Sequence, residues 1–215
     1  MNAEARCQIV SVLTAKEIVT FSDAAVPPGE SPWVGDHGPE TGVEIAAADP
    51  AWPQQYETLA ARIREALGEG VLGLEHVGST SVPGLPAKPI IDIDLTVADP
   101  GDEASYVPAL EGTGFVLLVR EWWWYGHRLL RHTSPACHLH VFAPDCPENV
   151  RHRIFRDWLR SHPEDQVLYA RPKVAAAEQT NSTGGHGMDY NGRKEAIVRE
   201  IYARAFRELG LLGAR

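Results

Sequence analysis

Hydrophobic residues follow two different periods along this chain. Alternating or β-branched apolar runs fill its middle, whereas apolar residues spaced three or four apart predominate on either side. The first pattern predicts strands at 43–45, 71–77, 91–97, 115–119, 127–132 and 137–142. The second predicts helices at 50–67, 103–110 and 197–209, and two more that begin at Pro147 and Pro163.

These elements predict an α+β fold, because the strands gather in the middle and do not alternate regularly with helices. Residues 43–215 are expected to form one domain. Residues 1–42 contain many turn and breaker residues, although 9–21 has enough Val, Ile and Leu for a strand or a short helix. We expect 1–42 to be an N-terminal extension that is partly packed on the domain or mobile.

Two breaker features are expected to shape the helices near the end of the chain. Pro172 is expected to interrupt the helix that begins at Pro163, and 180–188 to form a glycine-rich loop.

The tryptophans at 122–124 would either pack in the core beside a turn at Gly126 or form an aromatic wall for a planar ligand. A solvated helix face is expected for Arg151, Arg153, Arg156 and Arg160.

A pair of carboxylates marks the strand at 91–97. Asp92 and Asp94 are two residues apart, so both side chains project from one face, while Ile91, Ile93 and Leu95 point to the other. Two adjacent carboxylates repel each other, and a divalent cation is the usual relief. The strand therefore predicts a metal site on its polar face.

A small-residue turn lies shortly before this strand, with twelve residues between Gly78-Ser79 and Asp92. Gly78, Ser79, Thr80 and Ser81 offer backbone N–H groups and hydroxyls that would cradle phosphate oxygens. Lys88 lies between the turn and Asp92, where it would meet a phosphate. Small turn followed by paired carboxylates is the order found in nucleotidyltransferases, whose metal ions neutralise the phosphates and activate the attacking hydroxyl.

The amino-acid composition limits the classes of binding partner that we expect for this protein. The net charge of -9 argues against general binding to nucleic acid, and no apolar run is long enough to span a membrane. Three cysteines at irregular spacing do not form a disulfide framework, so we expect a cytoplasmic protein. The expected partners are a nucleotide and a small-molecule acceptor, and the sequence leaves the oligomeric state open.

The chain resembles the GrpB family, a branch of the nucleotidyltransferase superfamily fold, over about residues 43–206. The most specific block is EHVGSTSVPGLPAKPIIDIDLTV at 75–97. Further matches are Val43-Glu44-Ile45, Asp49-Pro50-Ala51-Trp52-Pro53, His138-Leu139-His140-Val141, FRDWLR at 155–160 with His162-Pro163, and the pairs Tyr169/Lys173 and Tyr190/Lys194. The resemblance implies a small mixed sheet flanked by helices, with the site where the turn and the carboxylates meet. Members of the family also occur fused to dephospho-CoA kinase.

The strand at 137–142 is where nucleotidyltransferases generally carry a third carboxylate. Here it offers His138 and His140, which share one face. Either would serve as a metal ligand or a general base, or both would be hydrogen-bonded core histidines. Mg²⁺ or Mn²⁺ is expected at Asp92, Asp94, His138 and His140. Because imidazole favours transition metals, the two histidines shift the preference from Mg²⁺ towards Mn²⁺ or Zn²⁺.

Two functions follow from these residues. The first is a metal-dependent nucleotidyltransferase-like enzyme with Asp92, Asp94 and His140 as catalytic residues. Its nucleotide phosphates would be bound by Gly78, Ser79, Thr80, Ser81, Lys88, Lys173, Tyr190 and Lys194. The alternative is a nucleotide- or coenzyme-binding module, or a His/Asp metalloenzyme, that has lost transferase chemistry. The missing third carboxylate favours the alternative.

Overall fold

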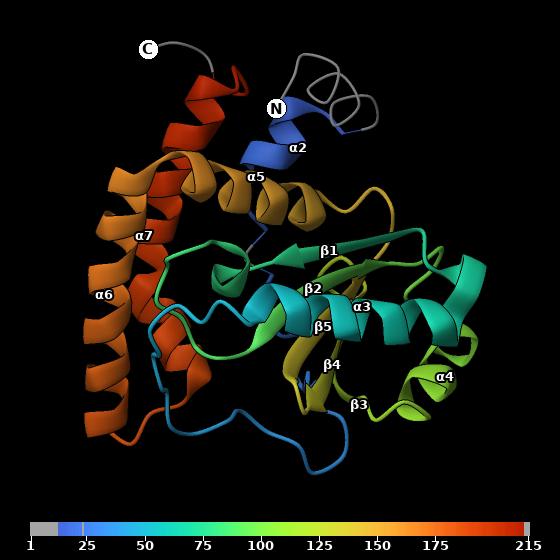
Figure 1. The fold of residues 1–215 in the computed structure, drawn as a ribbon. Helices are drawn as coiled ribbons and strands as arrows, with labels where there is room; N and C mark the ends of the chain where they lie inside the picture. The colour runs from blue at the N-terminus through green and yellow to red at the C-terminus, as the bar shows by residue number, and fades with distance from the viewer. Residues whose placement is uncertain (1–12, 23, 213–215) are drawn as a thin grey trace.

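A five-stranded mixed sheet forms the centre of the protein. The computed structural model describes residues 13–22 and 24–212, and its strands follow the order β1-β2-β5-β4-β3 (Figure 1). β2 and β5 run parallel, and the other neighbouring strands are antiparallel. The strands are β1 Gly73–Val77, β2 Ile91–Thr96, β3 Val116–Glu121, β4 His127–Thr133 and β5 Ala136–Phe142. The expected α+β fold with a small mixed sheet is confirmed.

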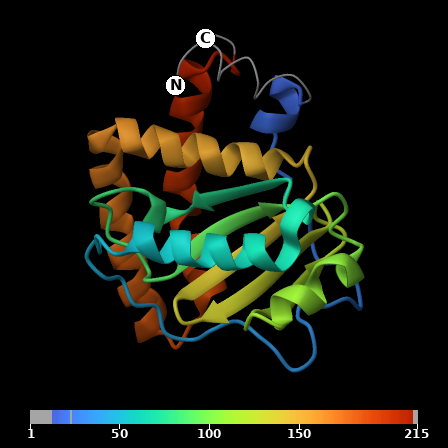
Figure 2. The ribbon, with the colours of Figure 1, turned by 45° about the vertical axis from the view of Figure 1, so that its right-hand side comes forward.

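Helices flank both faces of this sheet (Figures 1 and 2). Two of them, α3 and α4, cover the face that carries the main apolar core, and α5 and α7 lie over the opposite face. α6 packs against α7. The helices are α2 Ala15–Val19, α3 Trp52–Leu67, α4 Val107–Glu111, α5 Pro147–Ser161, α6 Pro163–Ser182 and α7 Gly187–Glu208.

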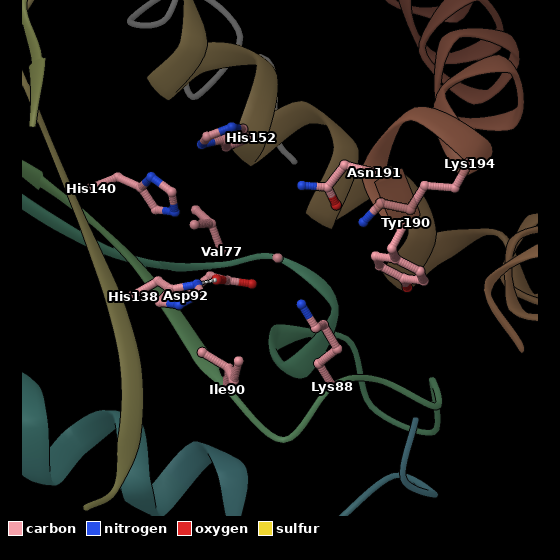
Figure 3. A pocket seen from close by; sticks show the side chains of 11 residues that line it. Val77, Lys88, Ile90, Asp92, His138, His140, His152, Tyr190, Asn191 and Lys194 are labelled. Atoms are coloured by element: carbon pink, nitrogen blue, oxygen red, sulfur yellow. Dashed lines mark ion pairs between the residues drawn. The ribbon is translucent and has the colours of Figure 1, made fainter. Parts of the chain in front are cut away.

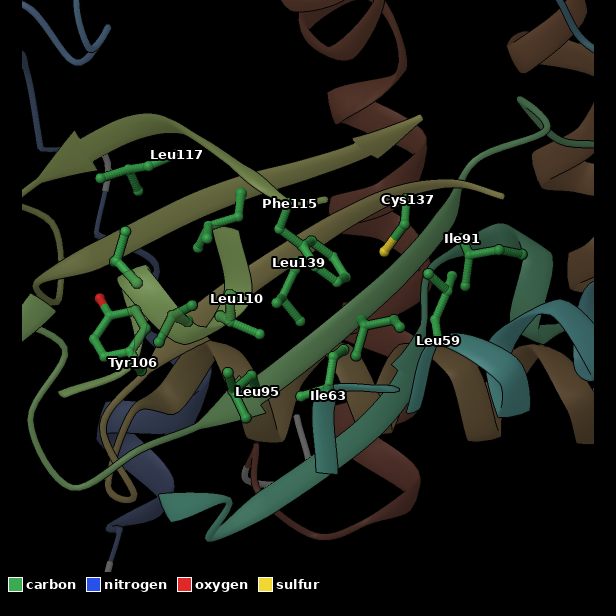
Figure 4. Packing of buried hydrophobic residues seen from close by; sticks show 14 of the residues in the cluster. Leu59, Ile63, Ile91, Leu95, Tyr106, Leu110, Phe115, Leu117, Cys137 and Leu139 are labelled. Carbon is green, nitrogen blue, oxygen red and sulfur yellow. The ribbon is translucent and has the colours of Figure 1, made fainter. Parts of the chain in front are cut away.

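The apolar core follows directly from the alternation in β2. Ile91, Ile93 and Leu95 are fully buried and meet Leu59 and Ile63 of α3 (Figure 4). Each such side chain contributes about 1.5–3 kcal/mol through burial of apolar surface. This packing fixes the orientation of β2, so its carboxylates must lie on the other face.

The extension packs on the domain over its described part. α2 has a capping box made by Thr14 and Glu17. The guanidinium of Arg151, which is fully buried in α5, donates hydrogen bonds of 2.7 Å to the carbonyl oxygens of Glu17 and Ile18. Further along, Trp33 pairs with Val119 at the edge of the sheet. Residues 1–12 lie outside the described residues, and the boundary at residue 42 stays a prediction.

Several predicted elements differ from the observed ones. Residues 43–45 form no strand, because this segment makes only isolated bridges, at Thr41 and Ala46. α3 begins at Trp52, since the carboxylate of Asp49 accepts a hydrogen bond from the backbone of Ala51 in the preceding turn. The loop at 180–188 is shorter than expected, and α7 starts at Gly187.

Pro172 does not interrupt α6, which continues to Ser182. Proline in a helix interior removes one backbone hydrogen bond and costs about 3 kcal/mol. Buried residues on both sides of it, Tyr169 before and Ala176 and Ala177 after, anchor the helix by packing. Tertiary contacts therefore outweigh the local penalty.

The tryptophan run forms the connection between β3 and β4, so the turn is confirmed and the core packing is not. Trp122 is 61% exposed, and the indole of Trp124 donates to the carbonyl oxygen of Ser22. None of these tryptophans lines the cavity described below. Among the described residues, no helix combines the length and apolar character needed to cross a lipid bilayer.

Candidate functional site

Two carboxylates and two histidines face each other on neighbouring strands. β2 and β5 are paired so that Asp92 lies opposite His138, and Asp94 opposite His140. All four side chains project from the face that is turned away from the apolar core. The expectation that the strand at 137–142 places histidines beside the carboxylates is confirmed.

A polar cavity of about 320 Å³ opens above this face (Figure 3). This volume lies in the range of small-molecule sites. The lining side chains come from the sheet, from the loop before β2, from α5 and from the first turns of α7. They are Val77, Gly78, Lys88, Ile90, Asp92, His138, His140, His152, Tyr190, Asn191 and Lys194.

Gly78 brings the backbone of the turn into contact with Asp92. Its φ is +66°, a conformation that side chains rarely adopt, and an added Cβ would lie 2.2 Å from Oδ2 of Asp92. Only glycine allows both the turn and this close approach. The turn therefore fixes the Asp92 carboxylate at the cavity wall.

Two lysines face Asp92 across the cavity (Figure 3). The ammonium groups of Lys88 and Lys194 lie 5.4 and 4.6 Å from the ring centroid of buried Tyr190, which supports both by cation–π interaction. Burial and the charge of Lys194 lower the pKa of Lys88. Burial raises the pKa of Asp92, and the positive charges of His138 and Lys194 oppose that shift. An anionic ligand would relieve the repulsion between the lysines.

Asp94 is paired with a histidine that the sequence did not reveal. Nδ1 of His152 on α5 lies 2.9 Å from Oδ2 of Asp94, whose side chain is almost fully buried. Burial alone would lower the pKa of His152, but the Asp94 carboxylate raises it to about 9. At neutral pH this pair consists of a carboxylate and an imidazolium, and Asp94 itself does not line the cavity.

A second hydrogen-bonded chain orients His140. Nδ1 of buried His127 donates to Glu121 over 2.7 Å, and Nε2 of His127 lies 3.1 Å from Nδ1 of His140. When His127 is neutral, its Nε2 accepts a hydrogen bond from Nδ1–H of His140, which leaves Nε2 of His140 unprotonated. Burial lowers the pKa of His140 well below its usual value. His140 is thus held as a neutral base.

The hydroxyls of Thr80 and Ser81 are hydrogen-bonded away from the cavity. Thr80 contacts Nε2 of His76 at 3.1 Å and Ser81 donates to the carbonyl of Gly78 at 2.6 Å. Neither these two nor Ser79 lines the cavity, although Gly78 does. Thr80 and Ser81 thus hold the turn together through their side chains.

Lys173 lies beneath the site and not in it. The side chain is buried, and its ammonium donates 2.6 Å to the carbonyl oxygen of Pro86 in the loop before β2. Burial and the charge of Lys194 lower its pKa to about 7. Lys173 therefore supports the loop that carries Lys88.

The four expected metal ligands do not converge on one point in this arrangement. Among the described residues, no three His, Cys, Asp or Glu side chains converge on a point that would hold a metal. Asp94 is engaged with His152, and Nδ1 of His140 with His127. Nδ1 of His138 lies 3.7 Å from Oδ1 of Asp92, so these two side chains alone remain close enough to share an ion.

Sequence reasoning missed His152, His127 and Asn191. His152 belongs to a row of polar residues spaced four apart on α5, Glu148, His152 and Arg156, and that row faces the sheet. A titratable stripe on an otherwise amphipathic helix was the available signal. The remaining two had no distinguishing pattern, because their positions depend on how β4 and α7 pack.

Comparison with known proteins assigns the chain to a family. The family described as GrpB protein matches residues 42–204. The chain belongs to the GrpB family. A UPF0157 protein from Halalkalibacterium halodurans is 45% identical over 163 residues, which are 76% of this chain and 82% of that protein. A UPF0157 protein from Streptomyces coelicolor is 40% identical over 170 residues, which are 78% of this chain and 87% of that protein.

A solved member of the GrpB family shares the fold. The crystal structure of the conserved protein GrpB from Enterococcus faecalis is 30% identical, has a TM-score of 0.67, and covers 77% of this chain and 98% of that one. A dephospho-CoA kinase from Mycolicibacterium paratuberculosis is 29% identical over 194 residues, which are 76% of this chain and 46% of that protein. This chain is thus similar to about half of that kinase.

Proposed function

We propose that this GrpB protein binds the phosphates of a nucleotide in the polar cavity and transfers the nucleotidyl group to a small-molecule acceptor. The observation that carries the proposal is the placement of Lys88 and Lys194 opposite Asp92 in one partly enclosed cavity. Because Asp94 and His152 neutralise each other, the two lysines outnumber the remaining carboxylate. Such a site favours an anion, and preorganised charges of this kind stabilise the transition state of phosphoryl transfer.

The proposed reaction is an in-line displacement. The hydroxyl oxygen of the acceptor attacks the α-phosphorus, a new P–O bond forms, and the bond to the pyrophosphate oxygen breaks. The proton of the hydroxyl passes to Nε2 of His140, which the chain through His127 and Glu121 orients. Lys88 and Lys194 stabilise the charge on the phosphates and on the departing pyrophosphate. Asp92, beside His138, positions the acceptor.

Nucleotide binding is tested first by thermal-shift titration with ATP, GTP, CTP and UTP, with and without Mg²⁺ or Mn²⁺. At least one triphosphate is expected to raise the melting temperature, because a ligand bound only to the folded state stabilises it. The metal ions expected from the sequence remain a prediction, and the paired titrations measure their effect. A flat response to all four triphosphates under every condition would refute nucleotide binding.

Transfer is tested by pyrophosphate release with that nucleotide and a panel of hydroxyl acceptors. Asp92→Asn is expected to abolish turnover while leaving circular dichroism and melting cooperativity intact. The exposed Asp36 provides a matched control, and Asp36→Asn should keep full activity. Full turnover of Asp92→Asn would contradict the mechanism.

The similarity to dephospho-CoA kinases supports a second candidate, a nucleotide- or coenzyme-binding module without transferase chemistry. The same two experiments separate the candidates. Triphosphate binding without pyrophosphate release for any acceptor would favour the module. Stabilisation by a metal ion alone, with no effect of nucleotide, would favour a His/Asp metalloenzyme.

A further inference from the structure

Polar residues on three neighbouring strands form one row across the sheet. Asp92 on β2 pairs in register with His138 on β5, and His138 pairs with Arg131 on β4. Paired residues project from the same face, so all three side chains share the face of the cavity. Because neighbouring strands lie about 4.8 Å apart, the row extends roughly 10 Å from Asp92 to Arg131.

A second cavity, of about 220 Å³, lies at the Arg131 end of this row. It shares two lining residues, Ile90 and His138, with the first cavity. His138 therefore stands at the boundary between the two spaces. A molecule bound in the second cavity would present one end to the reacting groups of the first.

The charged side chains that line the second cavity are Arg131 and Glu40, which form an ion pair. His132 also lines the cavity; its Nδ1 donates to the carbonyl oxygen of Pro135, and its Nε2 accepts a 2.7 Å hydrogen bond from Arg62, which is not a lining residue. An anionic group of a ligand would therefore take the place of the Glu40 carboxylate on Arg131.

Arg131 keeps donors for a ligand. One terminal nitrogen donates 2.7 Å to Glu40, whereas its Nε is buried and has no hydrogen-bond partner. The side chains of Arg131 and Glu40 are 33% and 47% exposed, so their ion pair is open to solvent and weakly held. Arginine binds carboxylate and phosphate groups through paired N–H donors, and Nε is commonly one of the pair.

Glu40 reaches this cavity from the N-terminal extension. It lies outside residues 42–204, the part that matches the family. Its backbone oxygen also accepts a 3.0 Å hydrogen bond from Gly187 at the start of α7, which fixes the segment beside both cavities. The Glu40 carboxylate thus occupies the place that an oxyanion of a ligand would take on Arg131.

We propose that the second cavity is the acceptor subsite, in which Arg131 binds an oxyanion, a carboxylate or a phosphate, of the acceptor and Glu40 competes with it. This inference rests on the proposed function, because a molecule in the second cavity is an acceptor only if the nucleotide fills the first. The acceptor would extend past His138, so that its hydroxyl meets Asp92 and His140.

The test is calorimetric titration of the full chain, without nucleotide, with succinate in one arm and glycerol 3-phosphate in the other. At least one probe is expected to bind saturably, and the comparison between the arms identifies the oxyanion. Arg131→Met should weaken that binding at least tenfold, whereas Lys16→Met, at an exposed lysine on α2, should leave it unchanged. Arg131→Lys, which keeps the charge but loses the paired donors, should be intermediate and serves if Arg131→Met does not fold.

Glu40→Gln gives a readout that a purely structural ion pair would not. Removal of the competing carboxylate should tighten binding of the same probe severalfold, with the melting temperature little changed. Saturable binding of neither probe would overturn the proposal, as would binding that Lys194→Met weakens and Arg131→Met does not. Because nucleotide is absent, this outcome is independent of the triphosphate titration, and either proposal can fail alone.

Discussion

At the scale of single residues, Gly78 links the turn to the chemistry. Its positive φ and the 2.2 Å approach of an added Cβ to Asp92 give two separate reasons for glycine. The substitution Gly78→Ala would strain the backbone and push the carboxylate away from the lysines. The placement of Asp92 therefore depends on a neighbour that has no functional group.

Gly84→Ala provides a matched control for this residue, because Gly84 also has a positive φ, +81°, but open space around an added Cβ. Both variants are expected to lose about 1 kcal/mol or more through backbone strain. Gly78→Ala should lose a further 1–3 kcal/mol or so from the steric conflict. Urea unfolding measures the difference in the free energy of unfolding. Equal losses in the two variants would contradict this account, because they would show that the Asp92 side chain moves aside at no cost.

At the scale of elements, buried His76 joins three pieces of structure. It lies on β1, its ring stacks on Tyr56 of α3 with centroids 4.7 Å apart, and its Nε2 contacts Thr80 of the turn. Burial lowers its pKa from 6.5 to about 4. Protonation of this ring would therefore oppose the packing of β1, α3 and the turn against each other.

The pH dependence follows from that shift. Unfolded His76 binds a proton near pH 6.5 and folded His76 only near pH 4, so its contribution is present above pH 6.5 and is lost as the pH falls towards 4. The full loss is about 3 kcal/mol. Urea unfolding from pH 7 to 4.5 should show a smaller fall for His76→Gln than for the wild type or for the exposed control His37→Gln. Parallel curves for all three would contradict this role.

The alternation of side chains along strands gave most of the correct predictions about these elements. It predicted the shared face of Asp92 and Asp94 and the matching face of His138 and His140, because both follow from the period of a strand. The helix partners were not predictable in this way. His152 reaches Asp94 from 58 residues away, and only the docking of α5 on the sheet brings them together.

Helix positions gave the weakest predictions. A solvated face was wrong for Arg151, which is fully buried, and for Arg156, whose largely buried side chain donates to the carbonyl oxygen of His76. Arg160 is exposed as expected, although it also donates to the carbonyl oxygen of Ser81. Arginine binds carbonyl groups as readily as it faces water, and its side chain is long enough to do either. The orientation of Thr80, Ser81 and Lys173 likewise depends on tertiary contacts.

At the scale of the whole molecule, the two faces of the sheet differ, because one packs in the apolar core and the other carries the polar residues of the candidate site. One face holds the apolar core with α3 and α4, and the other holds the first cavity under α5 and α7. The second cavity lies at the end of the sheet where β4 turns into β5, and side chains from both faces line it. The cavities line up along the row Asp92, His138, Arg131. This arrangement agrees with the proposed reaction between two bound molecules, in which the nucleotide would lie at one end and the acceptor at the other.

Calorimetric titration with the triphosphate that stabilises the protein most tests the central claim, that the first cavity binds nucleotide phosphates. The wild type should bind it saturably, and Lys88→Met and Lys194→Met should each weaken binding by roughly 10- to 100-fold, the worth of a hydrogen bond to a charged group. Lys16→Met, at an exposed lysine on α2, is the control and should bind like the wild type. Equal affinity in all four proteins would contradict the account.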